Sequence, residues 1–405
     1  MARALRRRAP DGPFTPAHCT AILFAGVVAI LFAGVGPFIL GALQAGGRLD
    51  AEQLGQAGTV ELVAMGLAAA FAAPLERRWG VRPLMAGCGL FTALCNGLIT
   101  QLSGYGLVGA CALVGLPCGV LIWMVTALIV RMERPERWAA FYLTIQTVAQ
   151  LAVVTAAGVL ARSATDVVPG VAILVVLSLA VAAVTPLAPA AFAPLGTPHA
   201  HASGTADASA ASSVPALAGI AALAAQFCYN AATLGLWVYF SPLLREAGMA
   251  TGLVVVATSA ALAGQVVGGV LATAIAPRLS FVRALAVSLV VMIGVLGIFA
   301  LAAPSTTLLM GAAILFGFLW MFAAPLLTPL TIAADPTRQA ASLGSGASLL
   351  GCGAGPFAAS LLVSDAHVRA SAAMTAGFLA LTLLLVALLA VFVLSPRARR
   401  TQVGA

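Results

Sequence analysis

The chain has 405 residues, of which 62% are hydrophobic and only 8% are charged. Soluble domains carry about 25% charged residues, so this composition excludes an ordinary soluble protein. The net charge of +8 does not indicate nucleic-acid binding, because the arginines are scattered over short segments rather than gathered on one face.

Long apolar stretches follow one another along the chain, separated by short polar segments. A helix rises about 1.5 Å per residue, so roughly 20 apolar residues cross a hydrocarbon core of about 30 Å. The sequence therefore predicts an all-α membrane protein with twelve transmembrane helices. We expect them near residues 17–43, 51–75, 83–101, 105–130, 138–161, 167–193, 215–243, 249–275, 283–303, 305–333, 339–363 and 368–394.

A polar segment separates the first six stretches from the last six. It is rich in Ala, Ser, Pro and Gly, residues with little to bury, so we expect a flexible linker. The predicted organisation is a basic N-terminus (1–16), a six-helix bundle (17–193), the linker (194–214), a second six-helix bundle (215–394) and a basic tail (395–405).

The arginines are distributed unequally between alternate gaps. Basic residues flank the cytoplasmic ends of transmembrane helices. Sixteen arginines lie at the termini or in one set of gaps: Arg3, Arg6, Arg7, Arg8, Arg77, Arg78, Arg82, Arg131, Arg134, Arg137, Arg278, Arg283, Arg338, Arg397, Arg399 and Arg400. The other gaps hold Arg48, Arg162, Arg245 and Arg369. This pattern predicts cytoplasmic termini in a multi-pass inner-membrane protein, and the absence of lysine favours a GC-rich bacterial source.

The two halves also share short motifs. Pro135-Glu136-Arg137 after the fourth stretch matches Pro336-Thr337-Arg338 after the tenth, 201 residues later. Trp123-Met124 is echoed by Trp320-Met321, and Ala73-Pro74 by Ala276-Pro277. Many transporters are built from repeats that move against one another about a central site, so these matches indicate an internal repeat of that kind.

With these features the chain resembles the major facilitator superfamily, whose members have two six-helix bundles and move small solutes by alternating access. The resemblance covers essentially the whole chain. The family's loop between the second and third helices, G-x-L-a-D-r-x-G-r-k, corresponds to residues 73–82, with Arg77 at the acidic position and Glu76 one place earlier. The resemblance implies a gating loop formed by Glu76, Arg77, Arg78, Gly80 and Arg82.

Other family motifs are missing or displaced. Drug/proton antiporters of this family usually carry an arginine in the fourth helix and G-x-x-x-G-P in the fifth, and neither occurs here. The run 351–356 in the eleventh stretch ends in Gly-Pro, which favours close packing and a bend, with an antiporter-like role as the alternative. Gly115-x-x-x-Gly119 and Gly264-x-x-x-Gly268 predict close helix contacts.

Glu61 is the acidic residue that lies deep within an apolar stretch. It stands about ten residues into the second helix, about 15 Å from its start. A carboxyl at this depth costs a few kcal/mol to insert, so it is a functional candidate by default. We interpret Glu61 as a proton-coupling or substrate-contacting residue. The alternative is a permanently protonated carboxyl that hydrogen-bonds a neighbouring helix.

Amide and aromatic side chains lie at similar depth. Amides can orient a solute without a buried charge, but they can equally join helices. Trp237 is close to a predicted helix end, where tryptophan commonly anchors at the membrane interface. The candidate substrate-cavity residues are Gln146, Gln150, Gln226, Asn230, Gln265, Trp123, Trp320 and Tyr229.

No catalytic or cofactor motif accompanies these residues. A nucleotide-binding P-loop requires a lysine, and no His, Cys and carboxylate cluster has metal-ligand spacing, so we expect no enzyme activity, cofactor or metal. We expect a monomeric secondary transporter that moves a small organic solute, coupled to protons, across the lipid bilayer. The absence of buried basic residues disfavours a strongly anionic solute. Efflux is favoured over uptake, and an uptake symporter, a uniporter and a non-transporting receptor or scaffold are the alternatives.

Overall fold

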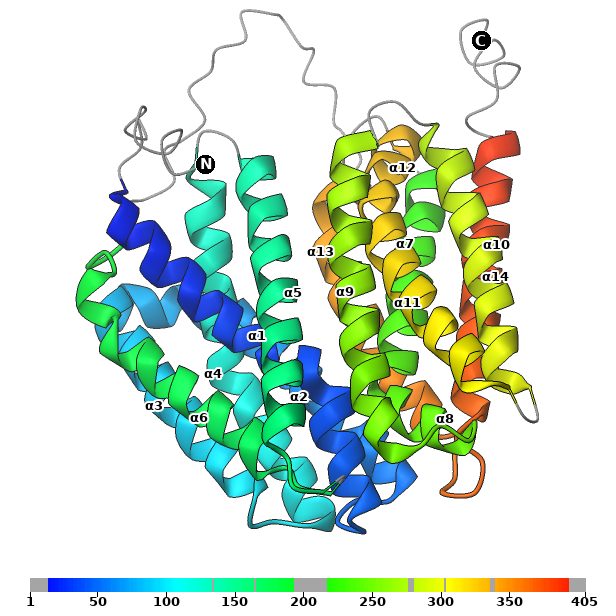
Figure 1. Cartoon of the computed structure of the whole chain (residues 1–405). Coiled ribbons are helices and arrows are strands. Elements are labelled where there is room, and N and C mark those ends of the chain that lie inside the picture. The colour runs from blue at the N-terminus through cyan, green and yellow to red at the C-terminus, as the bar shows by residue number, and fades with distance from the viewer. Residues whose placement is uncertain are drawn as a thin grey trace, which may run out of the picture.

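The computed structural model describes residues 14–132, 135–163, 165–192, 217–275, 280–301, 304–335 and 339–392. Helices make up nearly all of this part of the chain (Figure 1). They are α1 (Pro16–Ala45), α2 (Ala51–Trp79), α3 (Val81–Ile99), α4 (Gly104–Val130), α5 (Pro135–Leu160), α6 (Val168–Ala183), η1 (Thr185–Leu187), α7 (Leu217–Val238), α8 (Phe240–Glu246), α9 (Thr251–Ile275), α10 (Phe281–Ala300), α11 (Thr306–Ala323), η3 (Ala324–Leu326), α12 (Leu327–Ala334), α13 (Gln339–Ser360) and α14 (Ala370–Phe392).

The helices form two bundles that lie side by side (Figure 1). In the first bundle, α2 packs along α4 and α3 packs along α6. In the second, α7 packs along α13 and α9 packs along α11. Two of the expected spans are interrupted helices, because α7 continues into α8 and α11 continues through η3 into α12. The predicted linker (194–214) and tail (395–405) lie outside the described residues.

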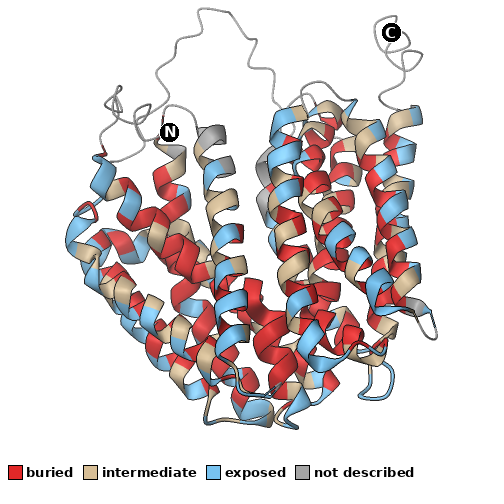
Figure 2. Cartoon of the chain, in the orientation of Figure 1, coloured by how far each residue is buried: buried red, intermediate tan, exposed pale blue. Residues whose placement is uncertain are grey.

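Helix length and surface composition both fit a membrane. Nine helical segments of the described chain are long and apolar enough to cross a bilayer. Figure 2 shows α1 largely buried, whereas outer helix faces carry exposed residues, among them large apolar side chains such as Phe71, Leu94 and Val159. The chain is therefore a multi-pass membrane protein. The count of twelve spans stays a prediction, as does the cytoplasmic location of the termini.

The first span of each bundle, α1 in the first and α7 with α8 in the second, ends with the same turn. Gly47 after α1 has φ 69° and Gly248 after α8 has φ 92°, values that favour glycine. In both turns this glycine donates to a carbonyl three residues earlier and the next residue donates to one five residues earlier, as in a Schellman motif. The bonds are Gly47 to Gln44, Arg48 to Leu43, Gly248 to Arg245 and Met249 to Leu244. The two sets are 201 residues apart, the offset seen between Pro135 and Pro336.

Glycines allow the central helices of each bundle to touch backbone to backbone. A side chain on Gly115 or Gly119 of α4 would overlap the carbonyl oxygens of α2. Gly264 and Gly268 of α9 approach the carbonyls of α11 in the same way. Both predicted G-x-x-x-G contacts are confirmed, because only a hydrogen in place of Cβ leaves room for this separation.

Candidate functional site

The two bundles meet at Gly34, near the middle of α1. Its carbonyl accepts a hydrogen bond from Nε1 of Trp237 in α7, at 3.1 Å. On its other side, the side chain of Gln150 in α5 lies so close that a Cβ on Gly34 would overlap it. The indole of Trp237 also contacts that of Trp320 in α11, with ring centroids 5.5 Å apart. We call these four residues the Gly34 junction.

The junction is aromatic on the side of the second bundle. Trp237 stacks on Phe240 with centroids 5.3 Å apart, and both are fully buried. Tyr229 is also buried, and its hydroxyl donates to the carbonyl of Trp320 at 2.6 Å, so it supports the junction from behind. Trp237 was not among the predicted cavity residues. Because α8 extends the seventh span to Glu246, Trp237 lies deeper than the sequence suggested.

The two amides of α5 differ in exposure. Gln150 is 7% exposed and packs against Gly34. Gln146 lies one turn nearer the start of α5 and is partly exposed. The first bundle therefore contributes amides to this region, where the second contributes indoles. No charged side chain belongs to the junction.

Three other predicted amides lie within the second bundle. Gln226 and Asn230 of α7 donate from their side-chain amides to the hydroxyl of Ser348 in α13, at 2.8 and 3.3 Å. Cys352 donates to Oδ1 of Asn230 at 3.8 Å. These bonds join α7 to α13. Gln265 of α9 is 3% exposed, and its Nε2 has no hydrogen-bond partner in the described part of the chain.

Trp123 lies near one end of the first bundle rather than at the junction. Its ring contacts that of Phe192 edge to face, with centroids 6.0 Å apart. Phe192 follows η1 and also meets Phe14, which precedes α1. The guanidinium of Arg131 lies over Phe192, 5.2 Å from the ring centroid. From the sequence, Arg131 was interpreted only as part of the charge pattern, so its contact with Phe192 was not predicted.

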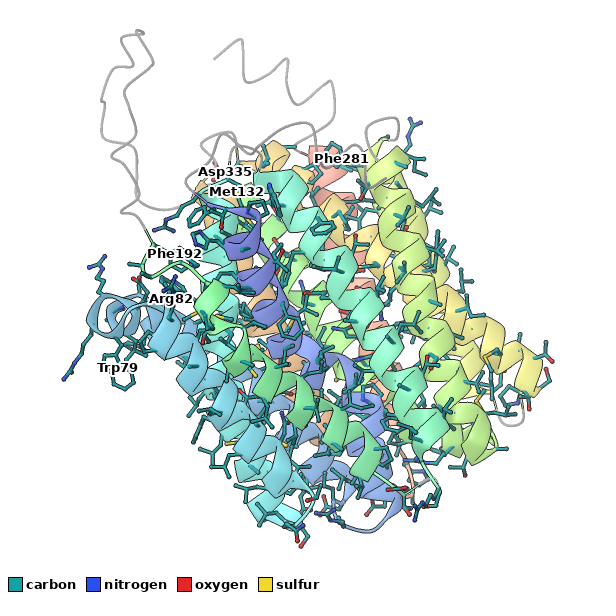
Figure 3. The ribbon with its side chains drawn as sticks, turned by 60° about the vertical axis from the view of Figure 1, so that its left-hand side comes forward. Trp79, Arg82, Met132, Phe192, Phe281 and Asp335 are labelled. Carbon is teal, nitrogen blue, oxygen red and sulfur yellow. The ribbon has the colours of Figure 1, made fainter. Side chains whose placement is uncertain are left out.

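The predicted gating loop is attached to the same segment of its own bundle. The backbone N–H of Phe192 donates to Oε1 of Glu76 at 3.2 Å, and Nε of Arg82 donates to the carbonyl of Ala188 at 2.8 Å. Figure 3 shows Arg82 and Phe192 at this end of the molecule. Gly80 links α2 to α3 with φ 79°. Arg77 and Arg78 are exposed.

Electrostatics reinforce this attachment. Arg131 follows α4, and burial lowers the pKa of its guanidinium, while the carboxylate of Glu76 acts in the opposite direction. The attraction acts between the end of α2 and the residue that follows α4. The hydrogen bond from the backbone of Phe192 to Glu76 joins α2 to residue 192, a role that the displaced position of Glu76 in the family motif did not reveal.

Glu61 is 2% exposed, and its Oε1 has no hydrogen-bond partner among the described residues. Its backbone carbonyl faces Gly115 of α4. Cys111 and Cys118, on the same side of α4, lie near enough to interact electrostatically with the carboxyl. Contacts of α2 with the second bundle come from other residues, such as Gly58 against Val238. Glu61 is thus directed toward α4 rather than toward the Gly34 junction.

The other hydrogen bonds between the bundles lie to one side of the junction, within the residues that the structure describes. They are Arg245 to the carbonyl of Gly41 (2.8 Å) and to Oε1 of Gln44 (3.4 Å), Tyr239 to the carbonyl of Ala51 (2.7 Å), Ala51 N–H to Asp365 (3.0 Å), Gln44 to Asp365 (3.4 Å) and Thr155 to Ser259 (3.4 Å). We call this end of the molecule, formed by loops 46–50, 161–167, 247–250 and 361–369, the closed end.

The closed end also contains the four arginines that depart from the charge pattern. Arg48 donates to the carbonyls of Ile99 and Leu102 within the first bundle. Arg369 pairs with Glu246 at 3.6 Å within the second. Arg245 joins the two bundles. Three of the four exceptions therefore stabilise loops and helix ends, whereas the side chain of Arg162 is exposed.

Solved structures with the same fold are transporters. A D-xylose–proton symporter has a TM-score of 0.72 and 13% identity, covering 93% of this chain and 97% of that one. The nucleoside transporter NupG has a TM-score of 0.64 and 11% identity, covering 92% and 98%. FucP, a major facilitator superfamily transporter solved in the outward conformation, has a TM-score of 0.56 and 18% identity, covering 92% and 97%. No family model and no curated protein matches the sequence. At these identities the likeness shows the fold alone.

Proposed function

We propose that this chain, which has the fold of the major facilitator superfamily transporters, is a secondary transporter that moves a small organic solute by alternating access. One observation carries the proposal: hydrogen bonds between the bundles, among the described residues, run from the Gly34 junction to the closed end. A transporter that opens one end at a time needs this asymmetry, because contacts on one side of the site must form while those on the other are released.

The charge pattern gives this asymmetry a direction. The closed end carries four of the twenty arginines, and basic residues are retained on the cytoplasmic side. We therefore assign the closed end to the outside and the described conformation to the inward-facing state.

The junction favours a neutral, polar, ring-containing solute. Indole rings stack on flat or ring-shaped solutes, and an amide both donates and accepts hydrogen bonds, so together they can hold such a solute without charge. The solved transporters of this fold include proteins named for D-xylose and for nucleosides, which are solutes of this kind. Gln146 and Trp320, which are partly exposed, are the residues that we expect to contact it, while Gln150 and Trp237 are buried in the described conformation.

Glu61 is our proposed proton site, at a distance from the solute. Its carboxyl is buried without a hydrogen-bond partner in the described chain, so protonation would relieve an unfavourable buried charge. Glu61 lies where α2 packs closely on α4, so a change in its protonation would alter the packing of these two helices. We favour efflux, in which solute and protons would move in opposite directions (antiport), whereas proton-driven uptake would move them together (symport).

The test is transport in proteoliposomes, with pentoses, hexoses and nucleosides as solutes and lipophilic cations as a comparison. Exchange of labelled for unlabelled solute needs no proton gradient and reports binding and alternation. Accumulation driven by a pH gradient reports coupling. Antiport concentrates solute inside vesicles with an acidic lumen, and symport concentrates it when the outside is acidic.

We expect Glu61→Gln to retain exchange but to lose gradient-driven accumulation. Glu52→Gln is the matched control, because Glu52 lies on the same helix but is exposed, and it should behave like wild type. Unchanged accumulation by Glu61→Gln would refute the coupling role. Failure of the wild-type protein to exchange any neutral ring solute would refute the proposed substrate class.

A further inference from the structure

A groove lies between the two bundles where α5 meets α9, near the closed end. Its volume is about 450 Å³, within the range of sites that hold small ligands. The two helices touch at Gly158 and Val255, and Phe38 of α1 also lines the groove. The groove therefore reaches from the outer surface of the seam to the helix that carries Gly34.

The walls of the groove continue the apolar outer surface. Val159 of α5 is 80% exposed and Val256 of α9 is 51% exposed, and both line it. Exposed valines on a membrane helix face hydrocarbon, because contact of their apolar surface with water would be unfavourable. An occupant of the groove thus has to present an apolar chain to these residues.

One end of the groove is polar. Arg162, Ser163 and Thr251 line it, and they lie just beyond the end of α5 and at the start of α9. This position corresponds to the boundary between hydrocarbon and headgroups. A ligand that occupies the whole groove must therefore combine an apolar chain with a polar head.

The charged group of Arg162 is available at this end of the groove. Among the described residues, the guanidinium of Arg162 has no ion pair or hydrogen bond, and no acidic residue lines the groove. The neighbouring Asp166 uses its two oxygens to accept from the backbone N–H groups of Arg162 and Val168. The other three arginines of the closed end are all engaged by protein groups.

We infer that this groove is a binding site for an anionic phospholipid, with one acyl chain along Val159, Val256 and Phe38 and the phosphate against Arg162. Arginine pairs well with phosphate through its planar set of donors. The site lies on a seam that must change shape if the bundles rock, so a bound lipid would fill the space between them. The inference needs a lipid bilayer around the protein but does not depend on which solute is moved.

Native mass spectrometry of the full-length protein tests the site. The delipidated protein is mixed with phosphatidylglycerol, phosphatidylethanolamine or phosphatidylcholine at matched concentration, and retained lipid is counted as detergent is stripped. We expect wild type to retain one phosphatidylglycerol preferentially. Arg162→Gln should lower that retention about fivefold, the effect of one basic residue near a lipid phosphate, and Arg162→Lys should restore most of it.

A second variant blocks the groove beside Thr251. Gly252 lines the groove, and a Cβ there would meet no atom within 4 Å, so Gly252→Phe should fold and keep the lipid out. Gly297→Phe is the matched control, because Gly297 is also free of neighbours but lies on α10. Equal retention of phosphatidylglycerol by wild type, Arg162→Gln and Gly252→Phe would overturn the site. Equal retention of phosphatidylcholine would overturn the anionic assignment.

Discussion

Gln44 and Arg245 lie 201 residues apart, at equivalent positions of the two repeats, and they touch: Nη2 of Arg245 donates to Oε1 of Gln44 at 3.4 Å. The same nitrogen donates to the carbonyl of Gly41 at 2.8 Å. Because equivalent positions of the two repeats touch here, the pseudo-twofold axis that relates the bundles passes near this pair. In the proposed transport cycle, this pair separates when the closed end opens.

Arg245→Gln is expected to favour opening of the closed end. A hydrogen bond from a charged group contributes about 1.5–3 kcal/mol, so its loss should shift the equilibrium roughly tenfold or more. A cysteine in place of Ser360, which is buried at the α2–α13 contact, would report opening by its rate of reaction with an impermeant maleimide. Arg48→Gln is the control, because Arg48 bonds within the first bundle. Equal labelling in Arg245→Gln and its parent would contradict the prediction.

Asp365 should give a graded series at the same end. Its Oδ1 accepts from the N–H of Ala51, the first residue of α2 in the other bundle, at 3.0 Å. Asp365→Asn keeps an acceptor but loses the charge that favours a helix N-terminus, and Asp365→Ala loses both. We expect the rate of maleimide labelling at Ser360→Cys to be lowest with Asp at position 365, higher in Asp365→Asn and highest in Asp365→Ala. A larger effect for Asn than for Ala would show that Asp365 does not act through this bond.

Gly34→Ala is expected to disrupt the junction. The added methyl would overlap the side chain of Gln150, and overpacking of this kind costs about 1–3 kcal/mol. Thermal unfolding in detergent should show a lower midpoint, and solute exchange should fall. Gly36→Ala is the control on the same helix, because a Cβ there would meet no neighbour within 4 Å.

The combination of Gly34→Ala with Gln150→Ala distinguishes packing from backbone effects. If the overlap with Gln150 is the cause, the double variant should recover most of the lost thermal stability. A double variant that is less stable than either single variant would locate the problem in α1 itself.

Glu76 should contribute to the stability of the first bundle. Glu76→Gln keeps an acceptor for the N–H of Phe192 but loses the attraction to Arg131, and Glu76→Ala loses both. We expect Glu76→Ala to lower the unfolding midpoint more than Glu76→Gln, because it leaves the buried N–H of Phe192 without an acceptor. An unsatisfied buried group of this kind costs about 1–3 kcal/mol. Arg78→Gln, at an exposed position of the same loop, should leave the midpoint unchanged. Equal midpoints for Glu76→Ala and wild type would exclude this structural role.

Several features of the fold were predictable because they depend on local properties of the chain. Runs of apolar residues fixed where the helices lie, since length and hydropathy alone decide whether a segment can cross a membrane. The glycine pairs at 115 and 264 marked close contacts, because only the absence of Cβ permits them. The 201-residue offset of Pro135 and Pro336 recurs in the turns at Gly47 and Gly248.

The candidate site was less predictable, because a sequence gives depth but not the neighbour that a side chain meets. Glu61, Asn230 and Trp237 all lie in apolar stretches, yet they face α4, Ser348 of α13 and Gly34 of α1 respectively. Helical periodicity shows which residues share a face. The order in which the helices pack decides what that face contacts.

By itself, therefore, the sequence determined an all-α, multi-pass membrane protein with two related halves and an asymmetric distribution of arginine. The tertiary structure alone decided that Arg245 joins the bundles while Arg48 and Arg369 act within them, and that the bundles meet at Gly34. The reason is physical: hydropathy and charge act on each segment separately, whereas a contact requires two segments whose proximity only the folded chain defines.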